Sequence, residues 1–497
     1  MSRKEYLIFP PLTILSSFLL FLSSPGIDIW PLAFLSLIPF FWVLKKSPSL
    51  FKTIFYSFLF GAVFYSSLLY WLIPTMRAGG VSYPLAFFSL LGLSFLLSTE
   101  FIIPSLLSFF VKKLGCLPWA LILASSWVLT DFLKIQINKW LPWFPWFNMA
   151  VTQHNDKFLL PYAFYFGIYG FSFFMIFFQA SLAFSLENKK TFLGKLLFFS
   201  GLIFAAAYSP FGKNLELSGE KIKIALIQPS VELYKKWDAS YVKEIMETNE
   251  NLSIKAAKEK PDVIIWPENA LPGWINEERL FLKISSLAQK TSSYHIIGSV
   301  SSQYGKHVSA FLISPEGKIS GEYRKIQLVP FGEYVPFRSF LGEKIEALGA
   351  MGEFEKGSNN QSPFNIKNFL AGPSICYESA FDYLFYSQKQ KGADFFFNIT
   401  NDGWYFDTLM PYQHLALAKI RAAENRIFLV RAANNGISAF IGPLGDLKIK
   451  SNLNDKTFLV FEIEKIKNTE SVFPKFFLVY LSLIILVSFL AARIILL

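Results

Sequence analysis

Long runs of apolar residues, separated by short polar loops, constrain this chain more than any other feature. Seven runs fill the first 212 residues and an eighth closes the sequence: Tyr6 to Phe21, Ile29 to Leu44, Ile54 to Ile73, Leu85 to Val111, Leu117 to Leu133, Phe158 to Leu186, Phe192 to Tyr208 and Phe473 to Leu497. A helix needs about 20 mostly apolar residues to cross the hydrocarbon layer of a membrane, and these runs meet or approach that length. We therefore expect seven transmembrane helices within residues 1–212 and an eighth within residues 473–497.

The composition agrees with a membrane protein. The 497 residues are 53% hydrophobic and include 56 Phe, which is more apolar surface than a soluble domain needs to fill its core. The basic start and apolar middle of the first run would also suit a secretory signal peptide, but the small-residue cleavage pattern is weak and further runs follow at once. We interpret the first run as the first span.

Lys and Arg residues in the short loops predict the orientation of these spans. If the spans alternate, one side of the membrane receives Arg3, Lys4, Lys45, Lys46, Lys52, Lys112, Lys113, Lys189, Lys190 and Lys195, and the other chiefly Arg77, Lys134, Lys139 and Lys157. Cytoplasmic loops carry the excess of positive charge, so we expect a cytoplasmic N-terminus and a segment outside the cytoplasm after the seventh span. Topology then explains part of the net charge of +11, and no basic run with interleaved aromatics suggests a nucleic-acid partner.

Between about Leu217 and Thr469 the composition changes to that of an ordinary α/β domain. Short apolar runs typical of strands recur there, and stretches such as Ser240 to Lys260 and Glu277 to Ser292 have apolar residues at helical spacing. A segment of this length can build its own core. Strands that alternate with helices predict a mostly covered sheet with helices on its faces.

Three polar residues directly follow or flank strand-like runs of this domain. Glu268 follows "DVIIWP", Lys325 lies in "GEYRKIQLVPFGEYVP", and Cys376 follows "FLAGPSI". Chemistry in α/β sheets gathers where strands end in loops, which makes these three the first candidates for a site. Taken singly, each also has an ordinary structural interpretation: a helix cap or loop charge, a solvated lysine, and a buried cysteine that acts as a small hydrophobe.

Cys376 is one of two cysteines in the chain, and the other, Cys116, lies at the expected cytoplasmic rim. The bilayer would separate the two, so no disulfide is expected. A thiol nucleophile needs a base and a positive or N–H environment for the oxyanion that forms. None of the domain's histidines lies in an obvious strand-end motif, but Glu268 can serve as base and Lys325 as electrostatic partner.

No HExxH, no ligand-spaced His/Cys cluster and no phosphate-binding GxxxxGK[ST] occurs, so we expect no metal, cofactor or nucleotide.

The motifs "IIWPENA", "YRKIQLVPFGEYVP" and "SICYES" resemble, in that order, the Glu-Lys-Cys motifs of the nitrilase (carbon-nitrogen hydrolase) superfamily. Together with several spans before them and one after, the whole chain resembles the apolipoprotein N-acyltransferase family, a membrane-embedded branch of that superfamily. The segments "NDGWY", "QHLALAKIRAAENR" and "NNGIS" are similar to later segments of the family. The resemblance implies a transmembrane bundle of about eight helices plus a nitrilase-like αββα sandwich at residues 217–469.

The resemblance also implies a function. Cys376 would take an acyl chain from a glycerophospholipid as a thioester and pass it to the α-amino group of a diacylglyceryl-cysteine at the N-terminus of an apolipoprotein. Glu268 would be the base, Lys325 would stabilise the oxyanion, and Glu333 would orient Lys325 and balance its charge. Tyr377 and Glu378 match family positions that support activity, and Trp237 matches a tryptophan that binds the second substrate; a core or interfacial aromatic is the alternative for Trp237.

This interpretation implies a monomer in the inner membrane of a bacterium, with the catalytic domain on the periplasmic side. The aromatic segment Lys139 to Ala150 would suit an interfacial floor or a plain aromatic belt, and Leu341 to Phe364 would suit an arm over the site or an ordinary surface insertion.

Two other functions remain open at this point. A membrane-anchored nitrilase-type amidase would use the same three residues and release its acyl group to water. A membrane receptor or assembly factor would keep the fold and tolerate loss of the thiol.

Overall fold

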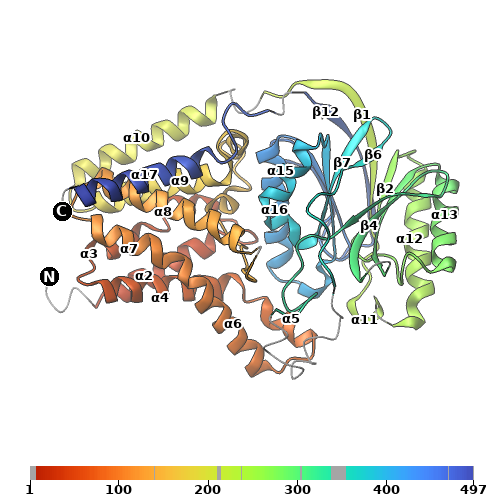
Figure 1. Cartoon of the computed structure of the whole chain (residues 1–497), viewed down its shortest axis with the longest axis horizontal. Coiled ribbons are helices and arrows are strands. Elements are labelled where there is room, and N and C mark those ends of the chain that lie inside the picture. Colours follow the sequence, from red (N-terminus) through yellow and green to blue (C-terminus); the bar gives the residue numbers. More distant parts are fainter. Residues whose placement is uncertain are drawn as a thin grey trace. The chain divides into compact units, whose positions relative to one another are not determined.

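The computed structural model describes residues 7–138, 140–209, 214–236, 238–302, 305–336, 354–467 and 470–495. The chain forms two compact units (Figure 1). The helical unit comprises Met1–Arg77, Ser82–Asn214 and Glu470–Leu497, and the α/β unit comprises Leu215–Thr469 together with Ala78–Val81.

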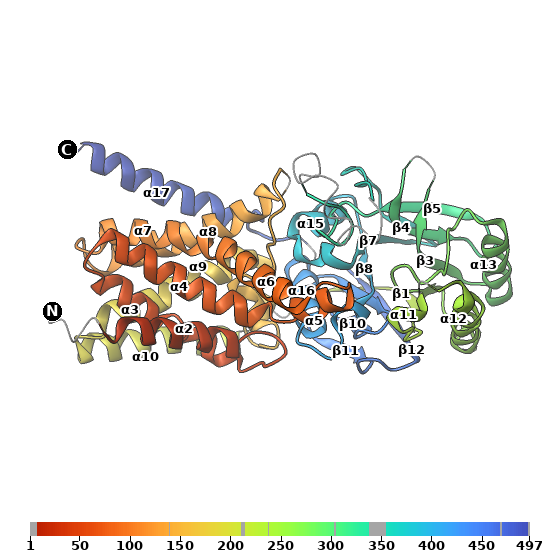
Figure 2. The ribbon, with the colours of Figure 1, turned by 90° about the horizontal axis from the view of Figure 1, so that it is seen from below.

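The helical unit is built from apolar helices, several of which run side by side (Figure 2). They are α2 (Phe9–Leu22), α3 (Ile38–Lys46), α4 (Leu50–Leu68), α5 (Leu72–Ala78), α6 (Tyr83–Ser98), α7 (Ile102–Val111), α8 (Cys116–Ile137), α9 (Ala163–Ser185), α10 (Lys189–Tyr208) and α17 (Phe477–Ile495). Among the described residues, four helical stretches are long and apolar enough to cross a membrane: Leu50–Leu68, Tyr83–Val111, Cys116–Ile137 and Leu160–Ser185. Phe9–Leu22 and Phe477–Ala492 are shorter apolar helices. The expected total of eight spans therefore stays a prediction.

The apolar run from Ile29 to Leu44 differs from the single long helix that its composition predicts. It contains a 3-10 turn at Trp30–Phe34 and then α3, which has nine residues and starts with Pro39 in its first turn. Nine helical residues extend about 14 Å, which is less than half of the hydrocarbon thickness. Proline fits the first turn of a helix but interrupts a helix that has already begun. A hydropathy average counts proline only by its polarity, so it does not detect such an interruption.

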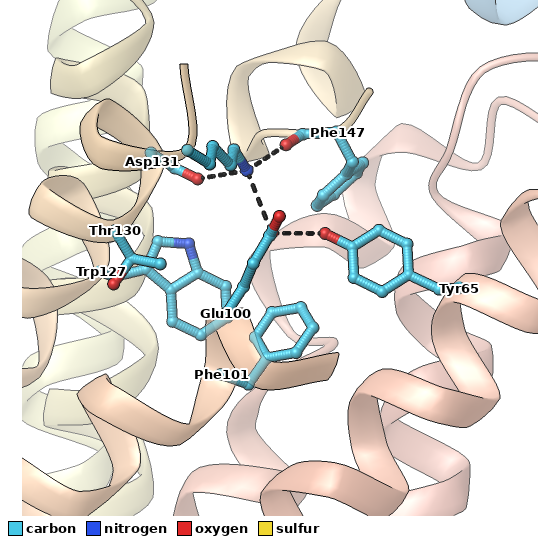
Figure 3. A pocket seen from close by; sticks show the side chains of 8 residues that line it. Tyr65, Glu100, Phe101, Trp127, Thr130, Asp131 and Phe147 are labelled. Atoms are coloured by element: carbon cyan, nitrogen blue, oxygen red, sulfur yellow. Dashed lines mark hydrogen bonds and ion pairs between the residues drawn. The ribbon is translucent and has the colours of Figure 1, made fainter. Parts of the chain in front are cut away.

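A cluster of charged residues buried in the helical unit is paired internally (Figure 3). Glu100 accepts hydrogen bonds from the Tyr65 hydroxyl at 2.6 Å and from the Trp143 indole at 2.7 Å. The Lys134 ammonium lies 2.8 Å from Asp131 and 3.4 Å from Glu100. An unpaired charge in an apolar bundle costs several kcal/mol, so this cluster fixes the helices that supply it and the loop that carries Trp143.

The α/β unit contains two six-stranded sheets. The first has the order β12-β1-β2-β3-β4-β5, with β1 (Leu217–Gln228), β2 (Val263–Ile265), β3 (Tyr294–Ser301), β4 (His307–Ile313), β5 (Ile319–Arg324) and β12 (Thr457–Ile466). The second has the order β11-β10-β9-β8-β7-β6, with β6 (Phe364–Ile366), β7 (Phe369–Ile375), β8 (Phe395–Thr400), β9 (Phe428–Ala433), β10 (Ala439–Ile441) and β11 (Leu447–Lys450). Strands β1, β2 and β3 pair in parallel, as do β7, β8 and β9.

Helices cover the outer faces of both sheets (Figure 1). α12 (Val242–Ala257) and α13 (Glu278–Thr291) cover the first sheet, and α15 (Asp382–Gln390) and α16 (Met410–Asn425) cover the second; α11 (Leu233–Lys236) is a single turn after β1. The inner faces meet at contacts such as that of Phe440 with Phe461, whose ring centroids are 5.5 Å apart. The unit is thus a helix-sheet-sheet-helix sandwich, as the motifs predict.

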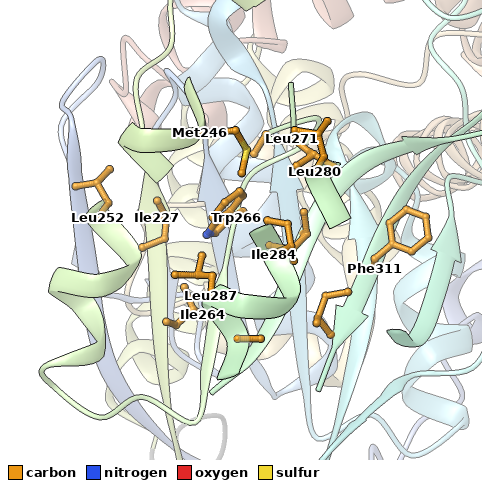
Figure 4. Close-up of a cluster of buried hydrophobic side chains, with 14 of the residues drawn as sticks. Ile227, Met246, Leu252, Ile264, Trp266, Leu271, Leu280, Ile284, Leu287 and Phe311 are labelled. Carbon is orange, nitrogen blue, oxygen red and sulfur yellow. The ribbon is translucent and has the colours of Figure 1, made fainter. Parts of the chain in front are cut away.

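The apolar face of α13 shows why these segments fold as they do (Figure 4). Leu280, Ile284 and Leu287 are spaced by four and three residues, so they share one helix face, and all are buried against the first sheet near Trp266. Truncating such a buried aliphatic side chain to Ala costs about 2–5 kcal/mol. This core holds β2 and β3 rigidly, and the loop after β2 carries Glu268.

Candidate active site

Cys376 lies at the point where β7 ends. It begins the 3-10 turn Cys376–Ala380 and has a backbone φ of +50°, in the left-handed region that non-glycine residues rarely adopt. Such a conformation costs about 1–3 kcal/mol and persists only where neighbouring contacts enforce it. The thiol is buried, with 6% of the residue exposed, and it interacts with the Thr400 hydroxyl.

Glu378 stabilises this turn through hydrogen bonds to its carboxylate. One carboxylate oxygen accepts hydrogen bonds from the backbone N–H of Ile326 at 2.6 Å and of Gln327 at 3.1 Å. The other accepts from the backbone N–H of Ile375 at 2.7 Å and from the Tyr323 hydroxyl at 2.9 Å. Burial raises the pKa of Glu378 to about 7, although the three backbone donors act to lower it. Glu378 therefore joins the turn of the cysteine to the segment that follows Lys325.

Lys325 lies between two carboxylates. Its Nζ is 3.0 Å from Oε1 of Glu268 and 2.6 Å from Oε1 of Glu333, and the side chain is fully buried. Backbone N–H groups hold the remaining oxygens, since Glu268 Oε2 accepts from Asn401 and Glu333 Oε2 accepts from Val329. Two loops that are 57 residues apart in sequence thus meet at one ammonium group.

The charges of Lys325, Glu268 and Glu333 influence one another, and those of Lys325 and Glu268 act on Cys376. Burial opposes the charge of Lys325, but Glu268 and Glu333 outweigh it and raise its pKa well above the ordinary value. Burial and then the Glu268 carboxylate raise the pKa of the Cys376 thiol, while Lys325 acts to lower it. The thiol is consequently neutral at pH 7 and needs a base before it can attack, and the neighbouring carboxylate can accept its proton.

A glycine allows Glu268 to sit where it does. A Cβ added to Gly298 of β3 would lie 2.2 Å from the backbone oxygen of Pro267 and 2.7 Å from Cα of Glu268. Both are backbone atoms, which cannot rotate away as a side chain would. The loop of Glu268 therefore packs directly on the backbone of β3.

The sequence did not indicate a second layer of residues beneath Cys376. His414 of α16 donates from Nε2 to the backbone carbonyl of Cys376 at 2.9 Å, and Asn398 donates to the same oxygen at 3.4 Å. Nδ1 of His414 lies 3.0 Å from both Asp402 and Arg431, and Arg431 also binds Asp402 at 2.8 Å. Burial and Arg431 lower the pKa of His414, so the ring is neutral, with its proton on Nε2.

The sequence also did not indicate Lys236, at the end of α11. Its Nζ donates to the backbone carbonyl of Glu268 at 3.2 Å. Burial lowers the pKa of Lys236 to about 8, while the charges of Glu268 and Cys376 act to raise it. A second lysine therefore lies within electrostatic reach of the thiol.

The structure describes some of the remaining predicted residues and segments but not all of them. Tyr377 is buried beside Cys376 and packs edge-on against Phe381 with ring centroids 5.0 Å apart. Trp237 lies outside the described residues, as does most of the predicted arm from Leu341 to Phe364. In the aromatic segment after α8, Phe144 and Trp146 stack with ring centroids 5.3 Å apart.

The part of the chain that the structure describes holds no group of three or more His, Cys, Asp or Glu side chains that could bind a metal ion. Both cysteines are free thiols.

Comparisons with known proteins relate both halves of the chain to one family. The model of the apolipoprotein N-acyltransferase N-terminal domain matches residues 16–181, and that of the carbon-nitrogen hydrolases matches residues 223–467. The apolipoprotein N-acyltransferase of Geobacter metallireducens is 30% identical over 479 residues, covering 93% of this chain and 89% of that one. That of Haemophilus influenzae is 30% identical over 474 residues, covering 91% and 88%.

Among solved structures, a carbon-nitrogen hydrolase from Helicobacter pylori G27 matches with a TM-score of 0.38 and 18% identity, over 49% of this chain and 89% of that one. The assignment rests on the sequence relatives and on the two family models. The chain belongs to the apolipoprotein N-acyltransferase family, with a carbon-nitrogen hydrolase domain, and is a membrane-bound acyltransferase of bacterial lipoprotein maturation.

Proposed function

We propose that Cys376 carries the acyl chain as a thioester between two lipid substrates. The observation that carries the proposal is the position of Lys325, buried between Glu268 and Glu333 with its charge acting on a thiol in a strained turn. This arrangement combines a nucleophile, a base and a fixed positive charge, which are the parts that acyl transfer needs.

In the first stage, Glu268 takes the proton of the thiol and the sulfur attacks an ester carbonyl of a glycerophospholipid. Lys325 stabilises the oxyanion of the tetrahedral intermediate. The intermediate collapses with cleavage of the carbon-oxygen bond, Glu268 returns the proton to the leaving oxygen, and a lysophospholipid departs. The acyl chain remains on Cys376 as a thioester.

In the second stage, the α-amino group of a diacylglyceryl-cysteine at the N-terminus of an apolipoprotein attacks this thioester. Glu268 accepts a proton from the amine, the carbon-sulfur bond breaks, and the thiol is restored as the amide forms. Glu333 keeps Lys325 in place, Glu378 and Tyr377 support the turn of the cysteine, and Trp237 contacts the second substrate.

We propose further that residues 1–212 and 473–497 form eight spans of the bacterial inner membrane, and that the monomer holds residues 217–469 on the periplasmic side. The excess of Lys and Arg on one set of loops supports this orientation. Protease protection of an epitope inserted near Asn214 tests it, since protection from protease added outside would contradict it.

Intact mass spectrometry tests the first stage. Purified enzyme incubated with phosphatidylethanolamine should gain the mass of one acyl group, and the gain should be sensitive to hydroxylamine, as a thioester is. Cys376→Ala should gain none, while Cys116→Ala, the matched control, should gain as much as the parent. An unmodified parent, or an adduct that persists in Cys376→Ala, would contradict the proposal. Release of the acyl group to water without transfer to an amine would instead favour a hydrolase.

A further inference from the structure

The two lysines near Cys376 have different surroundings. Lys325 is fully buried and has two carboxylate partners at 3.0 and 2.6 Å. Lys236 is partly exposed, and within the described part of the chain its Nζ donates only to a backbone carbonyl, that of Glu268, at 3.2 Å. An ammonium group has three N–H donors, so Lys236 keeps two for a ligand.

The surroundings of Lys236 favour an anionic ligand. The ammonium end of Lys236 is more deeply buried than the residue as a whole, and among the described residues no carboxylate lies at contact distance from it, so its pKa is lowered to about 8. The nearby thiol and the Glu268 carboxylate act against that shift, but neither forms a hydrogen bond or ion pair with the ammonium. Binding of an anion would restore the favourable pairing that the free protein lacks.

A small cavity adjoins Lys236. Pro229, Val231 and Ile245 line it with apolar atoms, and Asn269 and Asn434 add polar groups. The Oδ1 atom of Asn269 is buried and accepts no hydrogen bond within the described residues. The cavity combines a cation with an unused acceptor, the two groups that a phosphate with a neighbouring hydrogen-bond donor would use. It has room for about one water molecule, so such a ligand has to widen it on binding.

We propose that Lys236 binds the phosphate of the acyl donor and that Asn269 accepts a hydrogen bond from its headgroup. This inference rests on the proposed glycerophospholipid donor. In such a lipid only the glycerol carbons separate the phosphate from the acyl esters, so a phosphate held by Lys236 keeps an ester close to Cys376. Lys325, already neutralised by two carboxylates, remains for the oxyanion.

Two acyl donors that differ in the phosphate test the proposal. Full-length enzyme in detergent receives either phosphatidylglycerol or a p-nitrophenyl ester of the same fatty acid, and the rate of acyl-enzyme formation is measured by intact mass at several donor concentrations. Lys236→Met should raise the KM for the phospholipid roughly 10-fold or more, because a charge-assisted hydrogen bond is lost, and should change the KM for the p-nitrophenyl ester far less. Lys236→Arg should remain close to the parent with both donors.

Lys235→Met is the matched control. Lys235 neighbours Lys236 but pairs with Glu244 at 3.1 Å, so its loss should change neither rate. Slowing of both donors by the same factor in Lys236→Met would overturn the proposal, since Lys236 would then act on the thiol or on Glu268. An unchanged phospholipid KM would overturn it as well. A parent enzyme that neither donor acylates at Cys376 would overturn the proposed function and this inference together.

Discussion

His414 donates a hydrogen bond from Nε2 to the backbone carbonyl oxygen of Cys376, 2.9 Å away, although 38 residues separate the two in sequence. The carbonyl belongs to the residue with the left-handed backbone, and its orientation sets the direction of the turn that presents the thiol. Arg431, which also binds Asp402, donates to Nδ1 on the far side of the ring. His414 is therefore a positioning residue in this structure and does not act as the base that histidine often supplies to a thiol.

Replacing His414 tests this positioning. Gln places a side-chain N–H near the position of Nε2, whereas Met has similar bulk and no donor. We expect His414→Met to slow acyl-enzyme formation by roughly 10-fold, since a buried carbonyl loses its donor, with little change in donor KM. His414→Gln should recover most of the rate.

The positioning role also predicts the pH dependence. If His414 were the base, both variants would abolish activity and remove the acid limb of the pH–rate profile. Retention of that limb in His414→Met is the expected result, and its disappearance would contradict the positioning role.

A methyl group at Gly298 should displace Glu268. The added Cβ of Gly298→Ala would lie 2.2 Å from the backbone oxygen of Pro267, so the loop has to shift. A displacement of about 1 Å at a catalytic group can cost ~100-fold in rate, and we expect a loss of that order in kcat. Gly92→Ala is the control, because an added Cβ there meets nothing within 4 Å. A normal kcat in Gly298→Ala would contradict the prediction that catalysis needs the Glu268 loop packed directly on β3.

Glu378→Gln should destabilise the α/β unit. An amide offers one acceptor oxygen in place of two, so at least one of the buried N–H groups of Ile326, Gln327 and Ile375 would lose its partner. The cost is about 1–3 kcal/mol and should lower the midpoint of thermal unfolding in detergent. Glu247→Gln is the control, because its side chain is 53% exposed and its pair with Lys243 is 3.8 Å long. Equal midpoints in the two variants would contradict the role of Glu378.

The lowered pKa of Lys236 predicts that the phospholipid donor binds more weakly at alkaline pH. The ammonium is charged below about pH 8 and loses its proton above that value, so the KM for a phospholipid should rise as the pH increases through 8. Arg stays protonated over this range, and Lys236→Arg should therefore give a flat KM. The same rise in both enzymes would assign it to another group.

The sequence predicts the residues that follow strands better than those that lie beneath them. Glu268 and Cys376 stand directly after apolar strand runs, where chemistry in α/β sheets gathers. They belong to different sheets, so their convergence follows from the packing of the two sheets against each other, which the strand pattern alone does not give. His414 carries no such signal, because it lies within α16 and its partner is a backbone atom.

The sequence carries no signal that places Lys236 in the site either. It lies in the four-residue helix α11, which is too short for any periodic pattern, and it follows another lysine that is bound at the surface. Which of two adjacent lysines turns inward depends on the backbone after β1, and composition does not encode this. For the same reason, hydropathy located the apolar runs of the helical unit but not the interruption before α3.

Transfer from an isolated acyl-enzyme distinguishes a thioester intermediate on Cys376 from direct transfer between the two lipids. Enzyme loaded with a deuterium-labelled acyl chain, freed of donor and mixed with a diacylglyceryl-cysteine peptide, should lose the label from Cys376 as the peptide gains it in an amide, at a rate compatible with turnover. An N-acetylated peptide should leave the label on the enzyme. If the label appears only as free fatty acid, or if the peptide becomes labelled while Cys376 keeps its acyl group, the thioester is not the intermediate of acyl transfer.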